Sequence, residues 1–210
     1  SESGHYDKVI GNPPYGAWQT LEKRELLKKK YVGQYVKETY TLFLLRSLSV
    51  LKNGGRLSFI VPDTFLFLNM HEKLRKILLT NTKIEEILIF PSKFFPGVSF
   101  GYSNLSIITL EKSDRDEALE NTVRIIKGFK SSEEFEEVLK SKFQRHHRIF
   151  ELKQLDIFTT EKSRFILADD EISTMIDASD KKLGEMASIV TGFYSGNNKK
   201  FICSKNEKEN

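Results

Sequence analysis

The chain has 210 residues, of which 39% are hydrophobic and 30% are charged, and its formal net charge is +4. This length fits one ordinary domain, or one domain and part of another. The small positive charge permits a nucleic-acid partner without requiring one. The single cysteine, Cys203, excludes an internal disulfide bond, and no apolar run approaches the ~20 residues of a membrane span. We therefore expect a cytoplasmic protein that makes no contact with a membrane.

Residues 6–16, with the sequence YDKVIGNPPYG, are the most informative stretch of the chain. Two β-branched residues before a glycine predict a strand over residues 6–10 that ends in a tight turn. Pro13 and Pro14 then hold their own φ at about −65° and keep the residue before each of them extended. The chain therefore forms a rigid corner directly after the strand.

This corner can present two hydrogen-bond acceptors at a fixed spacing, the side-chain carbonyl of Asn12 and the backbone carbonyl of Pro13, beside the ring of Tyr15. The arrangement suits the exocyclic amino group of adenine, which is a poor nucleophile because its lone pair is delocalised into the ring. Two acceptors would bind both N–H groups and direct the lone pair at an electrophilic methyl group, while Tyr15 stacks on the base. The alternative is a simple turn that closes a strand, with Tyr15 half-buried as packing.

With this corner the sequence resembles the DNA adenine-N6 methyltransferases of restriction-modification systems, which have NPPY at the catalytic position and a recognition domain after it. Three further stretches are similar to the same family and occur in the same order. They are a helix, Gly-Gly turn and strand at residues 38–68, an aromatic loop and final strand pair at 93–112, and the opening of the recognition domain at 192–202. The resemblance covers most of the chain and implies methyl transfer to a flipped adenine in double-stranded DNA.

The resemblance assigns roles to the corner and to one helix residue. It makes Asn12, Pro13, Pro14 and Tyr15 the catalytic residues. Asn12 and Pro14 would also contact the cofactor, S-adenosylmethionine, and Phe43 would stack on the adenine of that cofactor. From its pattern alone, Phe43 fits equally well as a core residue of the helix.

The resemblance also places aromatic side chains around the target base. A flipped base needs a contact on both faces, because extrusion costs a few kcal/mol of stacking. Tyr15 would cover one face and Phe95 the other, with Phe94 and Phe100 as alternatives. Ordinary packing of the loop is the competing interpretation.

Two basic segments are candidates for DNA contact. Lys199 and Lys200 lie in a loop that the resemblance puts beside the DNA cleft, although an ordinary hairpin explains either lysine equally well. Residues 18–37 are rich in lysine and form either a solvated helix with a loop or a phosphate-facing flap. His146 and His147 lie in another basic patch, and we expect no metal site there because adjacent side chains point different ways on a regular element.

The fold implied by the resemblance is the α/β, Rossmann-like sheet of an S-adenosylmethionine-dependent methyltransferase. In the family, the glycine-rich cofactor turn and an acidic residue that holds the ribose precede NPPY, and no such turn precedes residue 6. We therefore expect this chain to hold the second half of the sheet, with its last strand pair antiparallel, and to be inactive by itself. The strand at residues 6–10 would then be an exposed edge, which we expect a homodimer partner or a rearranged segment to cover.

Three regions follow from these assignments. Residues 1–113 would be the partial catalytic domain, 114–180 an α+β connector, and 181–210 the beginning of a target-recognition domain. Within them the patterns predict strands over residues 56–61, 83–90, 104–111 and 123–126, and helices over 38–52, 131–143 and 169–177.

Three local features are also expected. The first helix should stop at the sequence Asn53-Gly54-Gly55. Asp63 or Asn69 should cap the helix that follows Pro62. Residues 114–121, which are acidic, should form a loop.

Two other functions remain open beside a DNA methyltransferase with or without a fused nuclease. The same corner serves methyltransferases that modify the glutamine side-chain amide of translation release factors, but those lack a recognition domain of the kind that residues 181–202 would open. A non-catalytic DNA-binding or interaction fragment is the third interpretation.

Overall fold

The computed structural model describes residues 4–16, 20–95, 101–140 and 148–168, together with short stretches between residues 172 and 192. The chain divides into two compact units, Ser1–Leu167 and Ala168–Asn210. The described part of the second unit includes one short helix, α8 (Leu183–Met186), whose residues are all exposed. None of the helices among the described residues has the length and apolar character that crossing a membrane requires. The candidate site and its scaffold lie in the first unit.

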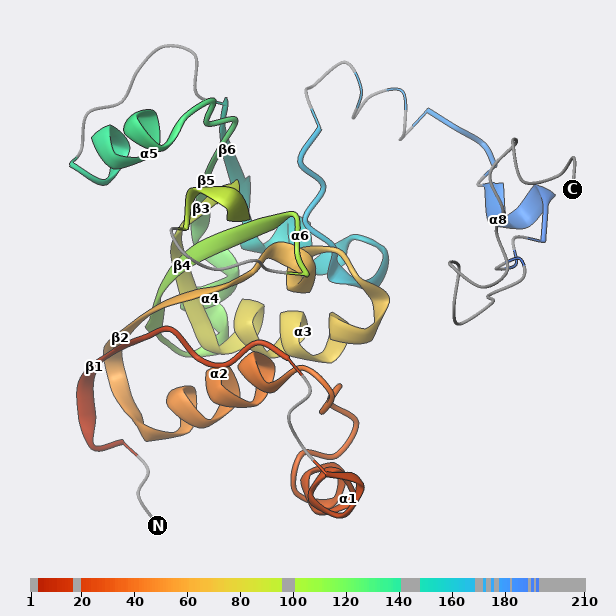
Figure 1. The fold of residues 1–210 in the computed structure, drawn as a ribbon. Coiled ribbons are helices and arrows are strands. Elements are labelled where there is room, and N and C mark those ends of the chain that lie inside the picture. Colours follow the sequence, from red (N-terminus) through yellow and green to blue (C-terminus); the bar gives the residue numbers. More distant parts are fainter. Residues whose placement is uncertain are drawn as a thin grey trace, which may run out of the picture. The chain divides into compact units, whose positions relative to one another are not determined.

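A six-stranded mixed sheet forms the centre of the first unit, with the order β1-β2-β4-β3-β5-β6 (Figure 1). β1 and β2 are parallel, and β4 lies antiparallel between β2 and β3. This confirms an α/β fold whose last strand pair, β3 with β4, is antiparallel. The strands are β1 (Tyr6–Gly11), β2 (Leu51–Pro62), β3 (Thr82–Pro91), β4 (Asn104–Lys112), β5 (Thr122–Lys127) and β6 (Arg148–Lys153).

Helices α2, α3 and α4 pack against this sheet. α2 contacts β2, and α3 contacts β3 and α4. The apolar side chains of α2 and α3 pack with those of the central strands into one core, and this burial of apolar surface stabilises the unit. The helices are α1 (Leu21–Lys30), α2 (Thr39–Val50), α3 (Glu72–Asn81), α4 (Arg115–Glu120), α5 (Ser132–Leu139) and α6 (Gln154–Thr159), with 3₁₀ turns η1 (Asp63–Leu66), η2 (Asn69–His71), η3 (Ser92–Phe94) and η4 (Glu161–Ser163).

The glycine pair at residues 54 and 55 shapes a strand and does not end the helix. α2 ends at Val50 and β2 begins at once with Leu51, so the helix was predicted to end two residues too late. Gly54 has a φ of +73°, and a Cβ at Gly55 would lie 2.9 Å from the backbone oxygen of Lys52. The glycines therefore allow an irregular turn of the backbone where β2 first meets β1.

Two other local predictions were wrong, one about a loop and one about a helix cap. Residues 115–120 form helix α4, since the Asp114 side chain accepts hydrogen bonds from two backbone N–H groups of its first turn. Asp63 and Asn69 open the 3₁₀ turns η1 and η2, so α3 starts only at Glu72, after a capping position that makes no side-chain hydrogen bond. The predicted N-terminus of the helix at residue 131 is confirmed, with Ser131 as its cap.

Residues 114–167 belong to the same compact unit as the preceding strands. β5 pairs in parallel with β3, and β6 pairs with β5. The first residue of α6, Gln154, is fully buried and anchors this region, since its side chain bonds the Ile84 N–H, the Asn121 amide and the carbonyls of Leu79 and Thr82. The functional domain boundaries stay a prediction, and the helix predicted over 169–177 falls largely outside the described residues.

β1 forms an edge of the sheet. It pairs on one side with β2, and no strand of the described residues pairs with its other side. Ile10, near its end, is 87% exposed. The expected edge is thus present. That a homodimer partner or a rearranged segment covers it stays a prediction.

Gln154→Ala should strongly destabilise the first unit. The substitution leaves buried backbone groups without partners, each of which costs about 1–3 kcal/mol, so we expect a loss of about 3 kcal/mol in the free energy of unfolding. Urea unfolding followed by circular dichroism measures this loss. Leu155→Ala is the matched control because that neighbouring side chain is 48% exposed. Equal unfolding midpoints for the two variants would contradict the anchoring role.

Candidate functional site

Three strands of the sheet end at one edge, and the candidate residues gather there. β1 is parallel to β2, and β2 and β3 are both antiparallel to β4, so β1, β2 and β3 run in the same direction. The corner, residues 12–15, follows β1, the turn η1 follows β2, and the turn η3 follows β3. Open α/β sheets bind ligands outside the carboxyl ends of their strands, so this edge is the expected place for a site.

The corner is held at both of its ends. On one side, Gly11 pairs with Phe59 of β2, and a Cβ at Gly11 would approach the Phe59 ring to 3.2 Å. On the other side, Thr39 of α2 donates two hydrogen bonds, from its N–H to the Tyr15 carbonyl (3.2 Å) and from its hydroxyl to the Gly16 carbonyl (2.6 Å). The start of α2 therefore sets the position of the chain that leaves the corner.

Within the corner, the Tyr15 hydroxyl donates a 2.8 Å hydrogen bond to Oδ1 of Asn12. The Asn12 and Pro14 side chains are exposed, whereas Pro13 is buried and Tyr15 is only 9% exposed. Burial raises the pKa of Tyr15 to about 12, so its hydroxyl keeps its proton at neutral pH. A carbonyl oxygen has two lone pairs, so Asn12 retains one for a ligand.

One ring that packs against Tyr15 is that of Tyr102, to which the sequence alone assigned no role. The two ring centroids are 6.3 Å apart and the planes are nearly perpendicular, at 81°. Phe94 and Phe95 are partly buried against the core, and Phe100 lies outside the described residues. The aromatic composition of the loop was the available signal, but it did not distinguish Tyr102 from its neighbours. The base-contacting role of Phe95 stays a prediction.

A buried polar cluster that the sequence analysis missed lies beside these rings. His71 is 1% exposed, and its Nε2 lies 2.9 Å from Oε2 of Glu38 and 3.4 Å from the hydroxyl of Tyr40. The Tyr40 hydroxyl lies 3.2 Å from that of Thr64. Burial, and the negative charge of the Glu38 carboxyl, raise the pKa of Tyr102. Glu38 and Tyr40 lie far from Thr64, His71 and Tyr102 in the sequence, so no local pattern links the two groups.

Asp63 places a buried carboxyl group at the same edge of the sheet. Its Oδ2 accepts a 3.2 Å hydrogen bond from the Asn104 amide, and burial raises its pKa. Among the described residues, no group of three or more His, Cys, Asp or Glu side chains is arranged to hold a metal ion. His146 and His147 lie outside those residues.

Phe43 lines a hollow of about 250 Å³ between α1 and α2, and 45% of the residue is exposed. It is therefore not a buried core residue of α2. The hollow is apolar and suits a planar ring stacked on Phe43. The other lining residues are Leu27, Tyr31, Thr39, Leu42 and Arg46.

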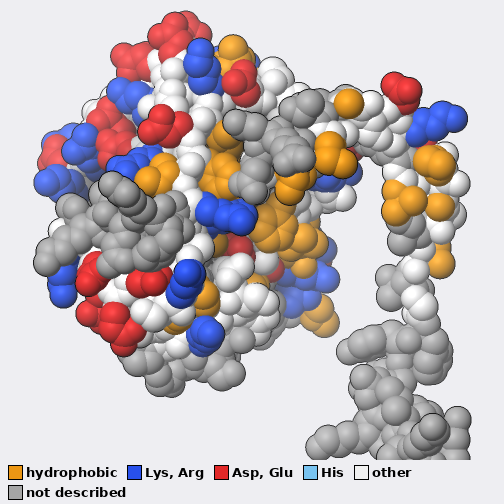
Figure 2. All heavy atoms as spheres, turned by 90° about the horizontal axis from the view of Figure 1, so that it is seen from above, with side chains coloured by type: hydrophobic (Ala, Val, Ile, Leu, Met, Phe, Trp, Pro, Cys, Tyr) orange, Lys and Arg blue, Asp and Glu red, His pale blue; other side chains and the backbone are white. Residues whose placement is uncertain are grey.

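The lysine-rich segment before α2 does contain a helix. No residue of α1 is buried, and its last turn has three lysines, of which Lys28 pairs with Glu25 at 2.7 Å. On the face of the first unit shown in Figure 2, basic and acidic side chains are interspersed. The phosphate-facing role of this segment stays a prediction, as does DNA binding by Lys199 and Lys200, which lie outside the described residues.

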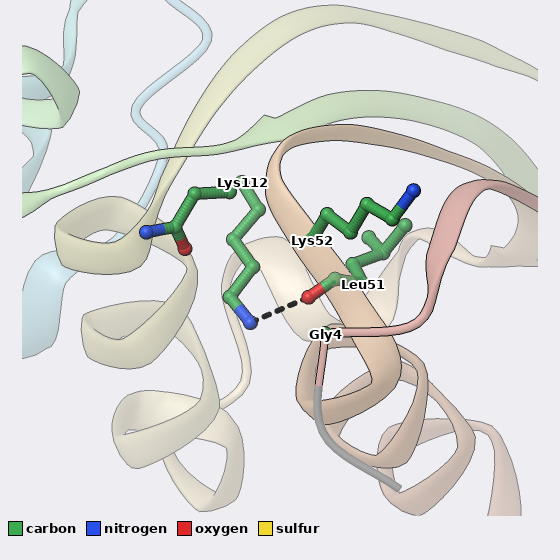
Figure 3. A pocket seen from close by; sticks show the side chains of 5 residues that line it. Gly4, Leu51, Lys52 and Lys112 are labelled. Carbon is green, nitrogen blue, oxygen red and sulfur yellow. Dashed lines mark hydrogen bonds between the residues drawn. The ribbon is translucent and has the colours of Figure 1, made fainter.

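A second hollow, of about 400 Å³, lies at the opposite end of the strands (Figure 3). It is lined by Gly4, the start of β2 and Lys112 at the end of β4. The Lys112 ammonium donates to the Leu51 carbonyl at 2.8 Å, and Lys52 pairs with Asp7 at 2.8 Å. Both cations are therefore satisfied within the chain, and the hollow is remote from the corner.

A known protein family matches the stretch of the chain that contains the corner. Residues 1–95 match the Eco57I restriction-modification methylase family. The family match includes the corner, α2, β2 and β3. It confirms the resemblance to restriction-modification methyltransferases that the sequence motifs indicated.

The chain is also similar to type II methyltransferases of known name. The chain is 41% identical over 101 residues to the type II methyltransferase M.HincII of Haemophilus influenzae, which covers 45% of this chain and 20% of that protein. It is 26% identical over 216 residues to the type II restriction enzyme and methyltransferase RM.Eco57I of Escherichia coli, and this alignment covers 98% of this chain and 20% of that protein. The chain thus spans about a fifth of the length of each.

A solved structure supports the fold. The type I restriction-modification system methyltransferase subunit from Streptococcus thermophilus superimposes with a TM-score of 0.51 at 20% identity, over 78% of this chain and 38% of that one. The sheet is therefore the partial Rossmann-like sheet expected from the sequence.

The titration of Tyr15 gives a stability test with a defined sign. Folding raises the pKa of Tyr15 from 10.0 to about 12. The contribution of the protonated hydroxyl to the free energy of unfolding is therefore fully present below pH 10 and is lost as the pH rises towards 12. Urea unfolding between about pH 9 and pH 12 should show the wild type losing stability relative to Tyr15→Phe. A stability difference that stays constant over this window would contradict the buried hydroxyl.

Proposed function

We propose that this chain is part of a longer enzyme of a restriction-modification system that methylates the N6 amino group of adenine in duplex DNA. The observation that carries this proposal is the rigid corner, with the exposed Asn12 amide oriented by Tyr15, at the carboxyl edge of a methyltransferase-type sheet. A DNA substrate of this kind places the enzyme in the cytoplasm.

The corner acts on the amino group by accepting its protons. Oδ1 of Asn12 and the carbonyl of Pro13 receive the two N–H groups, which draws the nitrogen towards tetrahedral geometry and frees its lone pair. S-adenosylmethionine supplies an electrophilic methyl group when bound. The methylated ammonium is acidic and loses its proton easily, so the corner needs no strong base.

The target adenine leaves the helix and enters between aromatic side chains. Tyr15 contacts one side of the base and Phe95 the other, with Phe94 and Phe100 as the alternatives in the same loop. These contacts offset the few kcal/mol of stacking that extrusion costs. Lys199 and Lys200, and the lysines of α1, would contact the phosphates of the duplex.

The residues present fit part of a cofactor site. Phe43 offers an exposed ring in an apolar hollow, which suits the adenine of S-adenosylmethionine. Asn12 and Pro14 border the same cofactor from the corner. The remaining contacts would come from a glycine-rich turn of the longer enzyme.

Asn12→Ala in the longer enzyme should lower turnover by about 10²- to 10³-fold, as expected when one pre-positioned hydrogen-bonding group at a reacting centre is lost. The measurement is methyl transfer to adenine-containing duplex DNA, with the product identified by mass spectrometry of nucleosides. Tyr15→Ala should also lower turnover. Asn53→Ala, an exposed asparagine beside the remote hollow, is the matched control. Near-normal turnover of Asn12→Ala would refute the two-acceptor mechanism, and methylated glutamine in place of N6-methyladenine would favour the release-factor class.

Phe43→Ala should weaken binding of S-adenosylmethionine by about tenfold, because an aromatic stacking partner contributes about 0.5–1.5 kcal/mol beyond its buried area. Calorimetric titration of the longer enzyme measures the dissociation constant. Affinity for DNA without cofactor should stay within about twofold since, among the described residues, none of the lysines proposed to contact DNA lines the hollow. Ile149→Ala, an exposed apolar residue of β6, is the control. Unchanged cofactor affinity in Phe43→Ala would remove this residue from the site.

A further inference from the structure

The first residue of α2, Thr39, donates two hydrogen bonds to the chain that leaves the corner. Its N–H bonds the Tyr15 carbonyl at 3.2 Å, and its hydroxyl bonds the Gly16 carbonyl at 2.6 Å. The first N–H groups of a helix have no partner within the helix, and the residue before Thr39, Glu38, makes no side-chain cap bond. The corner therefore supplies a carbonyl that the start of α2 needs, and the helix in turn holds the corner.

Thr39 also lines the apolar hollow that contains Phe43. Residues three or four apart on a helix share a face, and Thr39, Leu42, Phe43 and Arg46 have this spacing. All four line the hollow, so this face of α2 forms one of its walls. Thr39 lies only about 6 Å from Phe43 along the helix axis.

The parts that Thr39 joins are both stiff. Two residues of the opposite face of α2, Tyr40 and Leu44, are fully buried in the core, so the helix cannot easily follow a displaced corner. Pro13 and Pro14 fix the backbone of the corner itself. The separation between the corner and the hollow therefore depends on the contact that Thr39 makes.

We infer that Thr39 is a positioning residue, whose hydroxyl aligns the corner with the hollow. The inference rests on the proposed function, in which Asn12 of the corner holds the target amine and the hollow holds the adenine of S-adenosylmethionine. Methyl transfer needs its two reactants at a defined separation, and a misplacement of about 1 Å can cost about 10²-fold in rate. The hydroxyl therefore acts on the rate of the chemical step and not on the binding of either reactant.

Thr39→Val in the longer enzyme tests this role, because it removes the hydroxyl and keeps the shape of the side chain. The single-turnover rate of methyl transfer should fall by about 10- to 100-fold, since the corner loses one of its two hydrogen bonds to Thr39. The calorimetric dissociation constant of S-adenosylmethionine and the KM for DNA should stay within about twofold, because valine leaves the hollow apolar. Thr39→Ser, which keeps the hydroxyl, should recover most of the lost rate.

Thr80→Val is the matched control. The Thr80 hydroxyl also bonds a backbone carbonyl, that of Lys76 at 2.8 Å, but it lies near the end of α3 and just before β3 begins. The control should keep the wild-type single-turnover rate.

Hydrogen exchange of the enzyme without cofactor or DNA gives a readout that is independent of activity. The amide at position 39 bonds the Tyr15 carbonyl, and it should exchange about tenfold faster in Thr39→Val than in the wild type or in Thr80→Val. An unchanged exchange rate, an unchanged single-turnover rate, or a loss of rate that a weaker cofactor affinity explains would each overturn the inference.

Two further outcomes are separable. Should Thr39→Val fail to fold, Thr39→Ala decides in its place, with Thr80→Ala as its control. A wild-type enzyme that methylates no adenine would overturn the proposed function, and this inference with it. An active wild type together with an equally active Thr39→Val variant would overturn the inference alone.

Discussion

The two hydrogen bonds from Thr39 to the chain that leaves the corner are the constraint on which the candidate site depends. Pro13 and Pro14 have no backbone N–H, so the corner cannot be held by the ladder bonds that fix an ordinary strand. The two prolines make the corner stiff, but only contacts with neighbouring elements can fix its position on the sheet. The pairing of Gly11 with Phe59 of β2 and the hydrogen bonds from Thr39 of α2 supply that position, so a small shift of α2 would move the Asn12 amide.

The scaffold beneath the site extends further along the chain than the family match does. Arg75 of α3 is fully buried and donates hydrogen bonds to the carbonyls of Phe65 and Leu68 in the turns after β2, and to that of Lys162. Gln154 performs a similar role at the other end of α3, where it binds the carbonyls of Leu79 and Thr82. Lys162 therefore helps Arg75 to fasten the turns that face the site, whereas Gln154 fastens the opposite edge of the sheet. A buried side chain with many donors is costly to replace.

Much of the fold could be predicted from the sequence because it depends on local properties. The strands around Ile60, Leu88 and Ile108 are apolar runs bounded by turns, and the structure confirms each of them. The predictions that were wrong concern where helices begin and end, and one short helix, α4, that was predicted as a loop. The acidic residues after Asp114 suggested a loop, but the Asp114 side chain caps a helix there. Gly54 can equally well end a helix or bend a strand, and here it bends a strand.

The sequence by itself determined that a stiff, proline-containing corner follows a strand, because stiffness and strand character are properties of neighbouring residues, and its motifs indicated the resemblance to restriction-modification methyltransferases. Only the tertiary structure decided which side chains surround that corner. The Tyr15–Tyr102 ring contact and the pairing of Glu38 with His71 join segments that lie dozens of residues apart, and their distances depend on how α2, η2 and the aromatic loop pack on the sheet. No local pattern encodes that packing.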